Sequence, residues 1–147
     1  MGDKRVSLYK AIFRVQGKLN RLSKLHLEQF NLSGTEYGII KNLGENPLTL
    51  SELSERMLRV NSNTTAMIDH MEAKGLVRRE PDPGDRRVIR VKLTEAGIKL
   101  REEVVPKHDG FINELLAPLT EFETTALTAL LDKTEKICDY DIYNINR

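Results

Sequence analysis

The stretch from Leu48 to Gly97 constrains the fold more than any other part of this chain. Helical periodicity, capping residues and breaks at Gly and Pro divide it into consecutive segments. These are a helix over 51–58, a break at 59–61, a helix over 62–74, an extended run at 76–80, a turn at 81–85 and an extended return at 86–93. Two helices followed by a hairpin therefore form the predicted central unit.

The hairpin of this central unit is cationic, and the helix before it is long enough to lie in a groove of duplex DNA. A helix over 62–74 can lie in a major groove of duplex DNA. The hairpin beside it can reach the adjacent minor groove, where the negative potential is deep. The order of parts is that of a winged helix-turn-helix, and it predicts a DNA-binding function.

Helical patterns extend on both sides of the central unit. Apolar residues at three- and four-residue steps predict a long amphipathic helix over 4–29. Ser33 and Glu36 have the spacing of a capping box, which predicts a helix over 35–44.

The same capping-box spacing recurs at 49–52 and at 120–123, where two more helices are expected to start. Thr94 is expected to cap a further helix, and Pro106 within its pattern predicts a kink or a break. The expected order is α-α-β-α-α-β-β-α-α, which is a mainly α fold with a small β wing.

Composition narrows the class of protein. The 147 residues carry a net charge of +1, but residues 1–30 hold seven Lys or Arg against two Asp or Glu. Phosphate contact needs a basic face rather than a basic total, so this balance still permits DNA binding. A single cysteine, Cys138, excludes an internal disulfide, and no apolar run reaches the length of a membrane span. We expect a cytoplasmic protein.

The sequence holds no pattern that is typical of catalysis. Its histidines are scattered, without a His/Cys pair at metal-ligand spacing, and it has no nucleophile motif or phosphate-binding Gly loop. We therefore expect no enzyme activity, no cofactor and no metal. Cys138 is expected to be a small buried side chain, with a redox sensor as the alternative.

The second helix of the central unit has two distinct faces. One face is expected to pack inward, and it consists of Thr64, Met67, Ile68 and Met71. The opposite face is polar and low in bulk, which suits close approach to base edges and, at the helix N-terminus, to phosphate. It consists of Ser62, Asn63, Thr65, Ala66, Asp69 and His70.

Three further motifs occur in a fixed order along this region. They are the helix end Lys74-Gly75-Leu76-Val77, the wing Asp82-Pro83-Gly84-Asp85-Arg86-Arg87 and the helix start Leu93-Thr94-Glu95-Ala96-Gly97. The ordered set resembles the MarR family of bacterial transcription regulators, and the resemblance covers nearly the whole chain. Gly84 departs from it, because this wing position is often charged in the family.

The resemblance implies a homodimer on a pseudo-palindromic operator in double-stranded DNA. Helical regions 1–32 and 106–147 would form the dimerisation layer, and the winged helix-turn-helix domain 33–105 of each subunit would contact one half-site. It also implies a repressor that a small aromatic or lipophilic effector releases, although a ligand-insensitive DNA binder is left open. The residues expected to line the effector crevice are Phe13, Arg14 and Tyr37.

The expected DNA contacts come from the turn, the second helix and the wing. They are Arg59, Asn61, Ser62, Asn63, Thr64, Thr65, Asp69, His70, Arg86 and Arg87. Asn63 can bind adenine through two hydrogen bonds, whereas helix capping is the alternative role for Asn61 and Ser62.

The two wing arginines allow two interpretations. They can be edge charges that discourage strand pairing. Alternatively, one of them enters a narrow minor groove while the other pairs with a carboxylate, for which Asp69 is the candidate.

A winged helix that docks on another protein without binding DNA is the alternative function. An apolar outward face over 62–70 would favour that alternative, and the sequence does not have one.

Overall fold

The computed structural model describes residues 2–57 and 61–145, without the side chains of residues 2, 61–63, 141–143 and 145. The chain divides into two compact units, Met1–Asp109 and Gly110–Arg147. The predicted winged helix-turn-helix falls inside the first unit, so its helices and its wing belong to one compact body.

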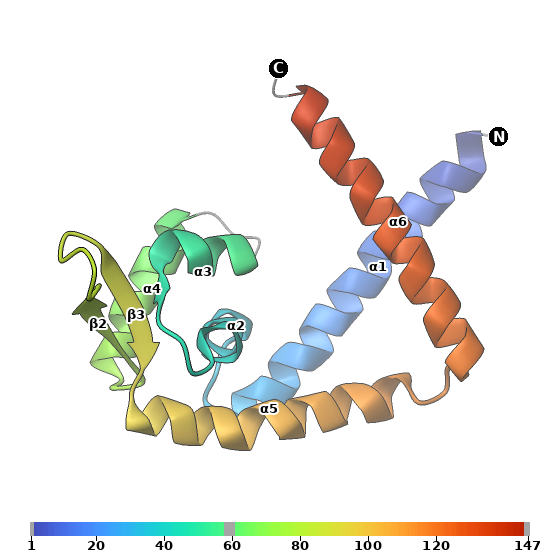
Figure 1. Cartoon of the computed structure of the whole chain (residues 1–147). Coiled ribbons are helices and arrows are strands. Elements are labelled where there is room, and N and C mark those ends of the chain that lie inside the picture. The colour runs from blue at the N-terminus through green and yellow to red at the C-terminus, as the bar shows by residue number, and fades with distance from the viewer. Residues whose placement is uncertain (1, 58–60, 146–147) are drawn as a thin grey trace. The chain divides into compact units, whose positions relative to one another are not determined.

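Helices and strands follow the predicted order, with one added 3-10 turn after the first helix (Figure 1). They are α1 (Gly2–Leu27), η1 (Glu28–Phe30), α2 (Gly34–Leu43), β1 (Leu48–Thr49), α3 (Leu50–Arg56), α4 (Asn61–Ala73), β2 (Val77–Pro81), β3 (Ile89–Leu93), α5 (Glu95–Leu116) and α6 (Glu121–Ile145). The strands pair antiparallel in the order β1-β3-β2, with Val91 of β3 opposite both Leu48 and Arg79. The prediction of a mainly α fold with a small β wing is confirmed.

Two helices of the first unit begin where the capping patterns predicted. At the start of α2, the Glu36 amide donates to the Ser33 hydroxyl over 3.1 Å, and the Ser33 amide donates to the Glu36 carboxylate over 2.7 Å. Thr49 and Glu52 form the same reciprocal pair at the start of α3. Each box satisfies backbone donors that a helix start leaves without partners, and so fixes the first residue of the helix.

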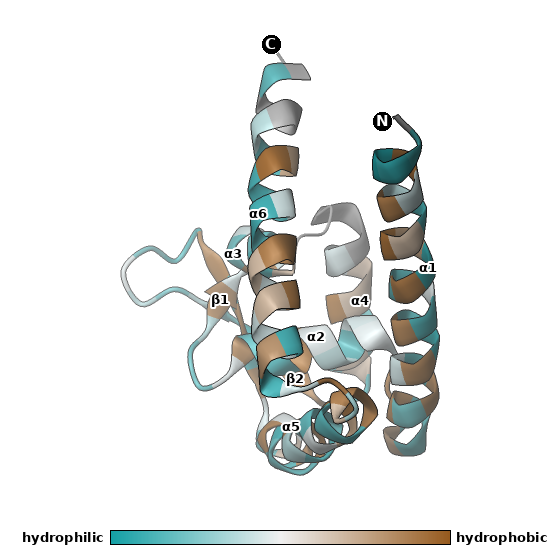
Figure 2. Cartoon of the chain, turned by 90° about the vertical axis from the view of Figure 1, so that its right-hand side faces the viewer, coloured by the Kyte–Doolittle hydropathy of each residue, from teal (hydrophilic) through white to brown (hydrophobic). Residues whose placement is uncertain are grey.

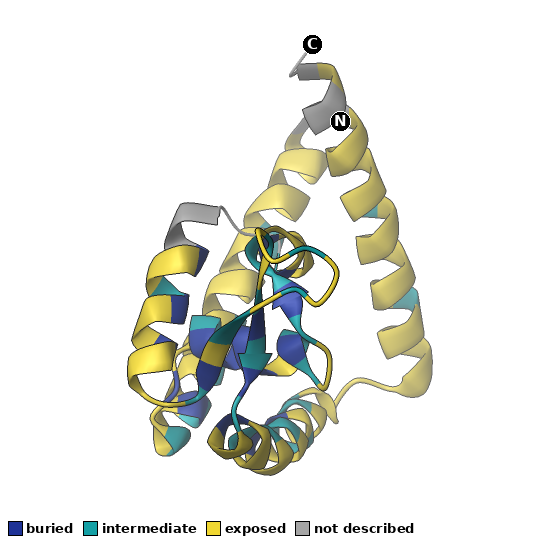
Figure 3. Cartoon of the chain, turned by 60° about the vertical axis from the view of Figure 1, so that its left-hand side comes forward, coloured by how far each residue is buried: buried dark blue, intermediate teal, exposed yellow. Residues whose placement is uncertain are grey.

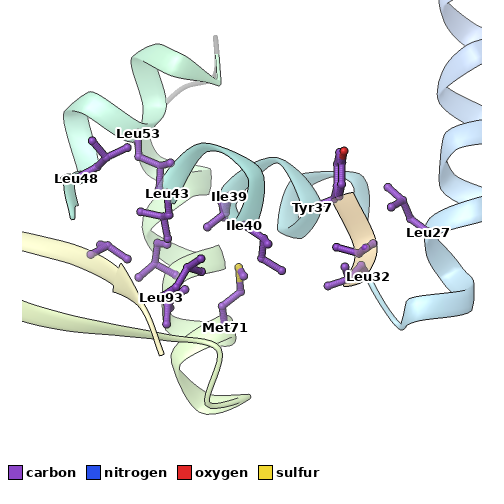
Figure 4. Packing of buried hydrophobic residues seen from close by; sticks show 14 residues of the cluster. Leu27, Leu32, Tyr37, Ile39, Ile40, Leu43, Leu48, Leu53, Met71 and Leu93 are labelled. Carbon is purple, nitrogen blue, oxygen red and sulfur yellow. The ribbon is translucent and has the colours of Figure 1, made fainter. Parts of the chain in front are cut away.

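The core of the first unit is largely aliphatic and lies where the sheet meets α2, α3 and α4 (Figure 4). Its members are Leu27, Leu32, Tyr37, Ile39, Ile40, Leu43, Leu48, Leu53, Ile68, Met71, Val77, Val91, Leu93 and Val104. Figure 3 shows the buried residues gathered where the strands and helices face each other. Ile68 and Met71 are fully buried, and they fix which side of α4 faces the core.

The junction between α4, the wing and α5 is tightly packed at Gly97. A Cβ added there would lie 2.1 Å from the carbonyl oxygen of Leu76, so only glycine fits. The Thr94 hydroxyl donates to the Gly75 carbonyl over 2.6 Å and accepts from the Gly97 amide over 3.1 Å. The predicted cap at Thr94 is confirmed, and it holds the start of α5 against the end of α4.

The returning strand of the wing is shorter than predicted. It begins at Ile89 rather than at residue 86, because the Asp85 carbonyl accepts from the Val88 amide over 2.9 Å and extends the turn. Arg86 and Arg87 therefore lie in the turn at the wing tip, beyond the paired strands.

Two predicted interruptions also differ from the structure. Helix α5 continues from Glu95 to Leu116 through Pro106, so the prediction of a break there is wrong. One proline removes a single backbone donor, and the remaining hydrogen bonds keep the helix continuous. Helix α4 begins at Asn61, one residue earlier than predicted, and residues 58–60 lie outside the described residues.

Hydrophobic residues recur along both long outer helices, α1 and α6 (Figure 2). Many of their large apolar side chains are exposed in the single chain. On α1 these are Val6, Leu8, Tyr9, Phe13, Val15, Leu22 and Leu25. On α6, which starts at the predicted Thr120–Glu123 capping box, they are Phe122, Leu127, Leu130, Leu131, Ile137 and Tyr140. None of the helices in the described part of the chain is both long and apolar enough to cross a membrane.

Candidate DNA-binding surface

Helix α4 presents a polar face on the side away from the core. Ile68 is fully buried, whereas Thr65, Asp69 and His70 are exposed. For the side chains that the structure describes, the predicted division of this helix into an inward and an outward face is confirmed.

Four predicted DNA contacts at the start of this surface have no described side chain. Arg59 lies outside the described residues, and the side chains of Asn61, Ser62 and Asn63 are undescribed although their backbone is part of α4. Their DNA contacts stay predictions.

Thr64 belongs to the core and not to the exposed face. Its side chain is 3% exposed, and its hydroxyl accepts from the Ser54 hydroxyl over 3.1 Å. This hydrogen bond joins α4 to α3 and uses a polar group that burial would otherwise leave without a partner. The prediction that Thr64 contacts DNA is therefore wrong, because its hydroxyl serves the packing of the two helices.

Arg79 of β2 joins the wing to α4. Its guanidinium donates to the carboxylates of Asp69 and Glu72, over 2.6 Å in each case. The Arg79 amide also donates to Glu72, over 3.2 Å. Burial acts to lower the pKa of Arg79, but the hydrogen bonds to Asp69 and Glu72 outweigh it and raise the pKa. A wing residue thus neutralises two carboxylates on the exposed side of α4.

This pairing corrects the predicted partner of Asp69. Asp69 was expected to pair with Arg86 or Arg87, and it pairs with Arg79 instead. The reason is geometric, because β2 follows α4 after one tight turn, whereas the other two arginines lie in the turn beyond the strands. A signal for Arg79 was present in the sequence: Asp69 and Glu72 are spaced to share one cation on the same helix face.

Asp82 organises the wing. Its carboxylate accepts from the Gly84 amide over 2.9 Å, from the Asp85 amide over 3.1 Å, and from the Arg90 guanidinium. Arg90 above all, and then the two amides, hold the pKa of Asp82 below its ordinary value. Arg90 also donates to Glu52 of α3 over 3.2 Å. A Cβ at Gly84 would lie 3.2 Å from the Asp82 carboxylate, which explains why glycine suits this position.

The two predicted wing arginines stand at the exposed tip. The Arg87 side chain is 92% exposed, and its Nε donates to Asp85 over 3.2 Å. Arg86 is exposed, and it forms no ion pair with the part of the chain that the structure describes. A neighbouring carboxylate orients Arg87 without burying it, so both guanidinium groups remain accessible.

His70 of α4 lies beside an ion pair between Glu36 of α2 and Lys74, the residue that follows α4. Its Nε2 is 3.4 Å from Glu36, whose carboxylate also accepts from Lys74 over 2.9 Å. Burial acts to raise the pKa of Glu36, but the hydrogen bonds from Lys74 and Ser33 outweigh it and lower the pKa. With 61% of its side chain exposed, His70 can still reach a phosphate.

The residues predicted to line an effector crevice have different surroundings. Phe13 is 55% exposed and packs on Tyr9, whereas Tyr37 is 9% exposed and packs on His108. A pocket of about 570 Å³ lies along the end of α1 and residues 31–35. Phe13, Arg14 and Tyr37 do not line this pocket, and their ligand role stays a prediction.

Other candidate chemistry is limited. Among the described residues, no group of three or more His, Cys, Asp or Glu side chains could hold a metal ion. Cys138 was expected to be buried, and it is exposed on α6 in the single chain. The expectation that Cys138 is buried is therefore wrong for the single chain.

Comparisons with known proteins find related regulators and a similar solved structure. A model of the MarR family matches residues 32–89. The HTH-type transcriptional regulator MhqR of Bacillus subtilis (strain 168) is 29% identical, over 90% of this chain and 92% of MhqR. The HTH-type transcriptional regulator PecS of Dickeya dadantii (strain 3937) is 32% identical, over 83% of this chain and 80% of PecS. A crystal structure of an S. aureus MepR–DNA complex is similar with a TM-score of 0.80 at 25% identity, over 88% of this chain and 97% of that one.

Proposed function

This chain belongs to the MarR family and is a DNA-binding transcriptional regulator, and we propose that it binds a pseudo-palindromic operator as a homodimeric repressor. One observation carries the proposal: α4 and the wing form a single surface in which Arg79 neutralises Asp69 and Glu72. Unpaired carboxylates on this helix would repel phosphate. Because both carboxylates are paired with Arg79, this face of α4 can approach the bases of DNA.

In this proposal, α4 enters the major groove. Asn63 is placed to bind a base edge, with adenine as the preferred partner, while Ser62 and Thr65 bind bases or phosphates without strong selectivity. The backbone amides at the start of α4 favour a phosphate next to the helix. Two copies of α4 related by a twofold axis meet successive major grooves about 34 Å apart.

The wing tip contributes the minor-groove contact. We assign the insertion to Arg87, because Asp85 holds one edge of its guanidinium and leaves the remaining donors in solvent. An arginine whose orientation is already fixed loses less freedom when it enters a groove. Arg86 lies next to it and supplies positive charge toward the phosphates.

Homodimerisation is supported by the exposed apolar residues of α1 and α6. Monomeric soluble proteins rarely leave apolar stripes of such extent in water. A second copy of the chain is the partner that covers them in the proposed assembly. The proposed location is the cytoplasm, where the operator DNA lies.

The effector part of the proposal concerns release from DNA. We propose a small aromatic or lipophilic molecule, and the volume of the pocket beside α1 falls in the range that small ligands occupy. Docking on another protein without DNA is not favoured, because the described outward face of α4 is polar.

Binding of operator DNA at several salt concentrations tests the proposal. The probe is a fluorescein-labelled duplex from the intergenic DNA beside the gene, chosen for an inverted repeat, and the control duplex carries the same bases with the repeat scrambled. A protein that neutralises several phosphates loses affinity steeply between about 50 and about 200 mM salt. Asn63→Ala is expected to cost about 1–3 kcal/mol at one base position. A flat salt response would contradict DNA binding.

A further inference from the structure

Two histidines join α1 to α5 within the first unit. The Nδ1 atoms of His26 on α1 and His108 on α5 are 3.0 Å apart. The Ser23 hydroxyl, almost one turn earlier on α1, is 3.1 Å from Nε2 of His108. His108 is 5% exposed, and His26 is half-buried. These contacts tie α1 to α5.

A hydrogen bond between two Nδ1 atoms requires that at least one of the two rings stays neutral. A neutral imidazole has one N–H donor and one acceptor nitrogen, whereas a protonated imidazole has two donors. A hydrogen bond between His26 and His108 therefore needs a proton on one Nδ1 and none on the other. The Ser23 hydroxyl can donate or accept, so it suits either arrangement. If both rings are protonated, two donors and two positive charges face each other.

Aromatic rings enclose the histidine pair. Tyr37 of α2 packs on His108 with 4.6 Å between ring centroids, and Phe30 of η1 packs on His26 with 5.6 Å between them. Burial raises the pKa of the Tyr37 hydroxyl above its ordinary value, so this group stays neutral over the range in which histidines titrate. The pair thus has an apolar wall on two elements, which disfavours added charge.

The charged groups around the pair do not offset the effect of burial, which favours the neutral form of His108. Lys41 of α2 and Asp109 of α5 both act on His108, and they are themselves 3.4 Å apart, so they partly cancel. Lys107 of α5 lies over the ring of Phe30. Burial lowers the pKa of His108 most, His26 and Lys41 lower it further, and Asp109 opposes them.

We propose that the His26–His108 contact is a proton-operated latch between α1 and α5, closed near neutral pH and released by acid. Helix α5 begins beside the base of the wing, and α1 carries an exposed apolar stripe. Release removes one tie between α1, which a second copy would cover, and α5, which begins beside the wing. The effect on operator affinity rests on the proposed function, whereas the latch itself does not.

The direction of the stability change follows from proton binding. Because the pKa of His108 is lowered in the folded protein, the unfolded chain binds more protons in the range between the two values. The stabilising contribution is fully present above the ordinary histidine pKa of about 6.5 and is lost as the pH falls below it. Acid therefore weakens the folded state through this pair.

An NMR titration of the imidazole signals tests the latch on the unmodified chain. The three histidines are His26, His70 and His108. As the pH falls from about 8 to about 5, coupled rings take up protons in two separated steps, whereas an isolated ring takes up its proton in one. We expect the His108 signal to change in two separated steps, because its Nδ1 lies 3.0 Å from Nδ1 of another ring that can also take up a proton. A single step of the His108 signal at the ordinary histidine pKa of about 6.5 would overturn the proposal.

A variant measures the consequence for stability. Glutamine carries both a donor and an acceptor, so His26→Gln can face His108 whether or not that ring is protonated. We expect the midpoint temperature of thermal unfolding to fall on acidification for the unmodified chain and for the matched control His70→Gln. We expect a smaller fall for His26→Gln. An equal loss in all three proteins would contradict the latch. If His26→Gln does not fold, the NMR titration decides.

Operator binding at about pH 7.5 and about pH 5.5 then separates the two proposals. We expect the unmodified chain to bind operator more weakly at the lower pH, and we expect this loss of affinity to be smaller for His26→Gln. If the chain binds no DNA at either pH, the proposed function fails while the titration still decides the latch. If it binds DNA with the same acid response in both proteins, the regulatory part of the inference is overturned and DNA binding stands.

Discussion

Replacing Arg79 with alanine tests the neutralised surface most directly. The change removes two hydrogen bonds of 2.6 Å and leaves Asp69 and Glu72 without their shared cation. The side chain of Arg79 is 26% exposed, that of Asp69 is 64% exposed and that of Glu72 is 40% exposed, so water screens both ion pairs. Exposed pairs each contribute about 0.2–1 kcal/mol, so we expect the free energy of unfolding to fall by about 1 kcal/mol.

The effect on DNA binding should exceed the effect on stability. At an assumed separation of about 8 Å from a phosphate in water, each uncompensated carboxylate adds about 0.5 kcal/mol of repulsion. Two of them add about 1 kcal/mol, which is about a fivefold rise in Kd. Loss of the tie between the wing and α4 adds to this, so we expect a rise of about tenfold at low salt that shrinks as salt screens the charges.

The assay is fluorescence anisotropy with the operator duplex at two salt concentrations. Arg78→Ala is the matched control, because it removes the same charge from the neighbouring residue of β2, whose contact with Glu80 is looser at 3.6 Å. Adding Asp69→Asn to the Arg79 variant should recover part of the affinity, since it removes one repelling charge. If Arg79→Ala binds operator as well as Arg78→Ala does, the reasoning is refuted.

Four further predictions concern separate parts of the structure. Glu36→Gln should lower the free energy of unfolding by about 1–2 kcal/mol at neutral pH, by loss of a cap and a buried ion pair. Because the Glu36 pKa is lowered in the folded state, this difference should vanish as the pH falls through and below the ordinary glutamate range, which thermal unfolding at several pH values will show. Gly97→Ala should cost about 3 kcal/mol, because its Cβ would meet a backbone carbonyl that cannot move aside; chemical denaturation measures this loss. Arg87→Ala should weaken operator binding more than Arg86→Ala, and equal losses would argue against the assigned minor-groove role. Leu130→Asp, at a position 63% exposed in the single chain, should shift the protein toward monomer in light scattering, and an unchanged mass would count against α6 as an interface.

The features that sequence predicted well depend on short-range chemistry. Ser33 and Glu36 form the capping box because a side chain three residues away is always within reach at a helix start. The inward face of α4 is equally local, since Ile68 and Met71 are placed by helical periodicity alone. The order of elements followed from such signals, repeated along the chain.

The features that sequence did not predict depend on contacts between separate elements. The partner of Asp69 depends on where β2 begins after α4. That position brings Arg79, and not the predicted Arg86 or Arg87, to Asp69. Thr64 was predicted both on the inward face of α4 and among the DNA contacts, and only its contact with Ser54 of α3 separates the two predictions. The contact between His26 and His108 joins residues far apart in the chain, and no local pattern indicates it.

The wing is held to both helices of the DNA-binding motif by one arginine from each strand. Arg79 of β2 reaches Asp69 on α4, and Arg90 of β3 reaches Glu52 on α3. A hairpin attached only through its sheet could move independently of the recognition helix, whereas two charge-assisted ties from different strands oppose that motion. We therefore expect the wing and the two helices to move together, so that regulation as proposed above would act on the placement of the whole winged unit. The His26–His108 contact lies where α1 meets this unit, so a change of protonation there can alter that placement while the DNA-binding surface stays intact.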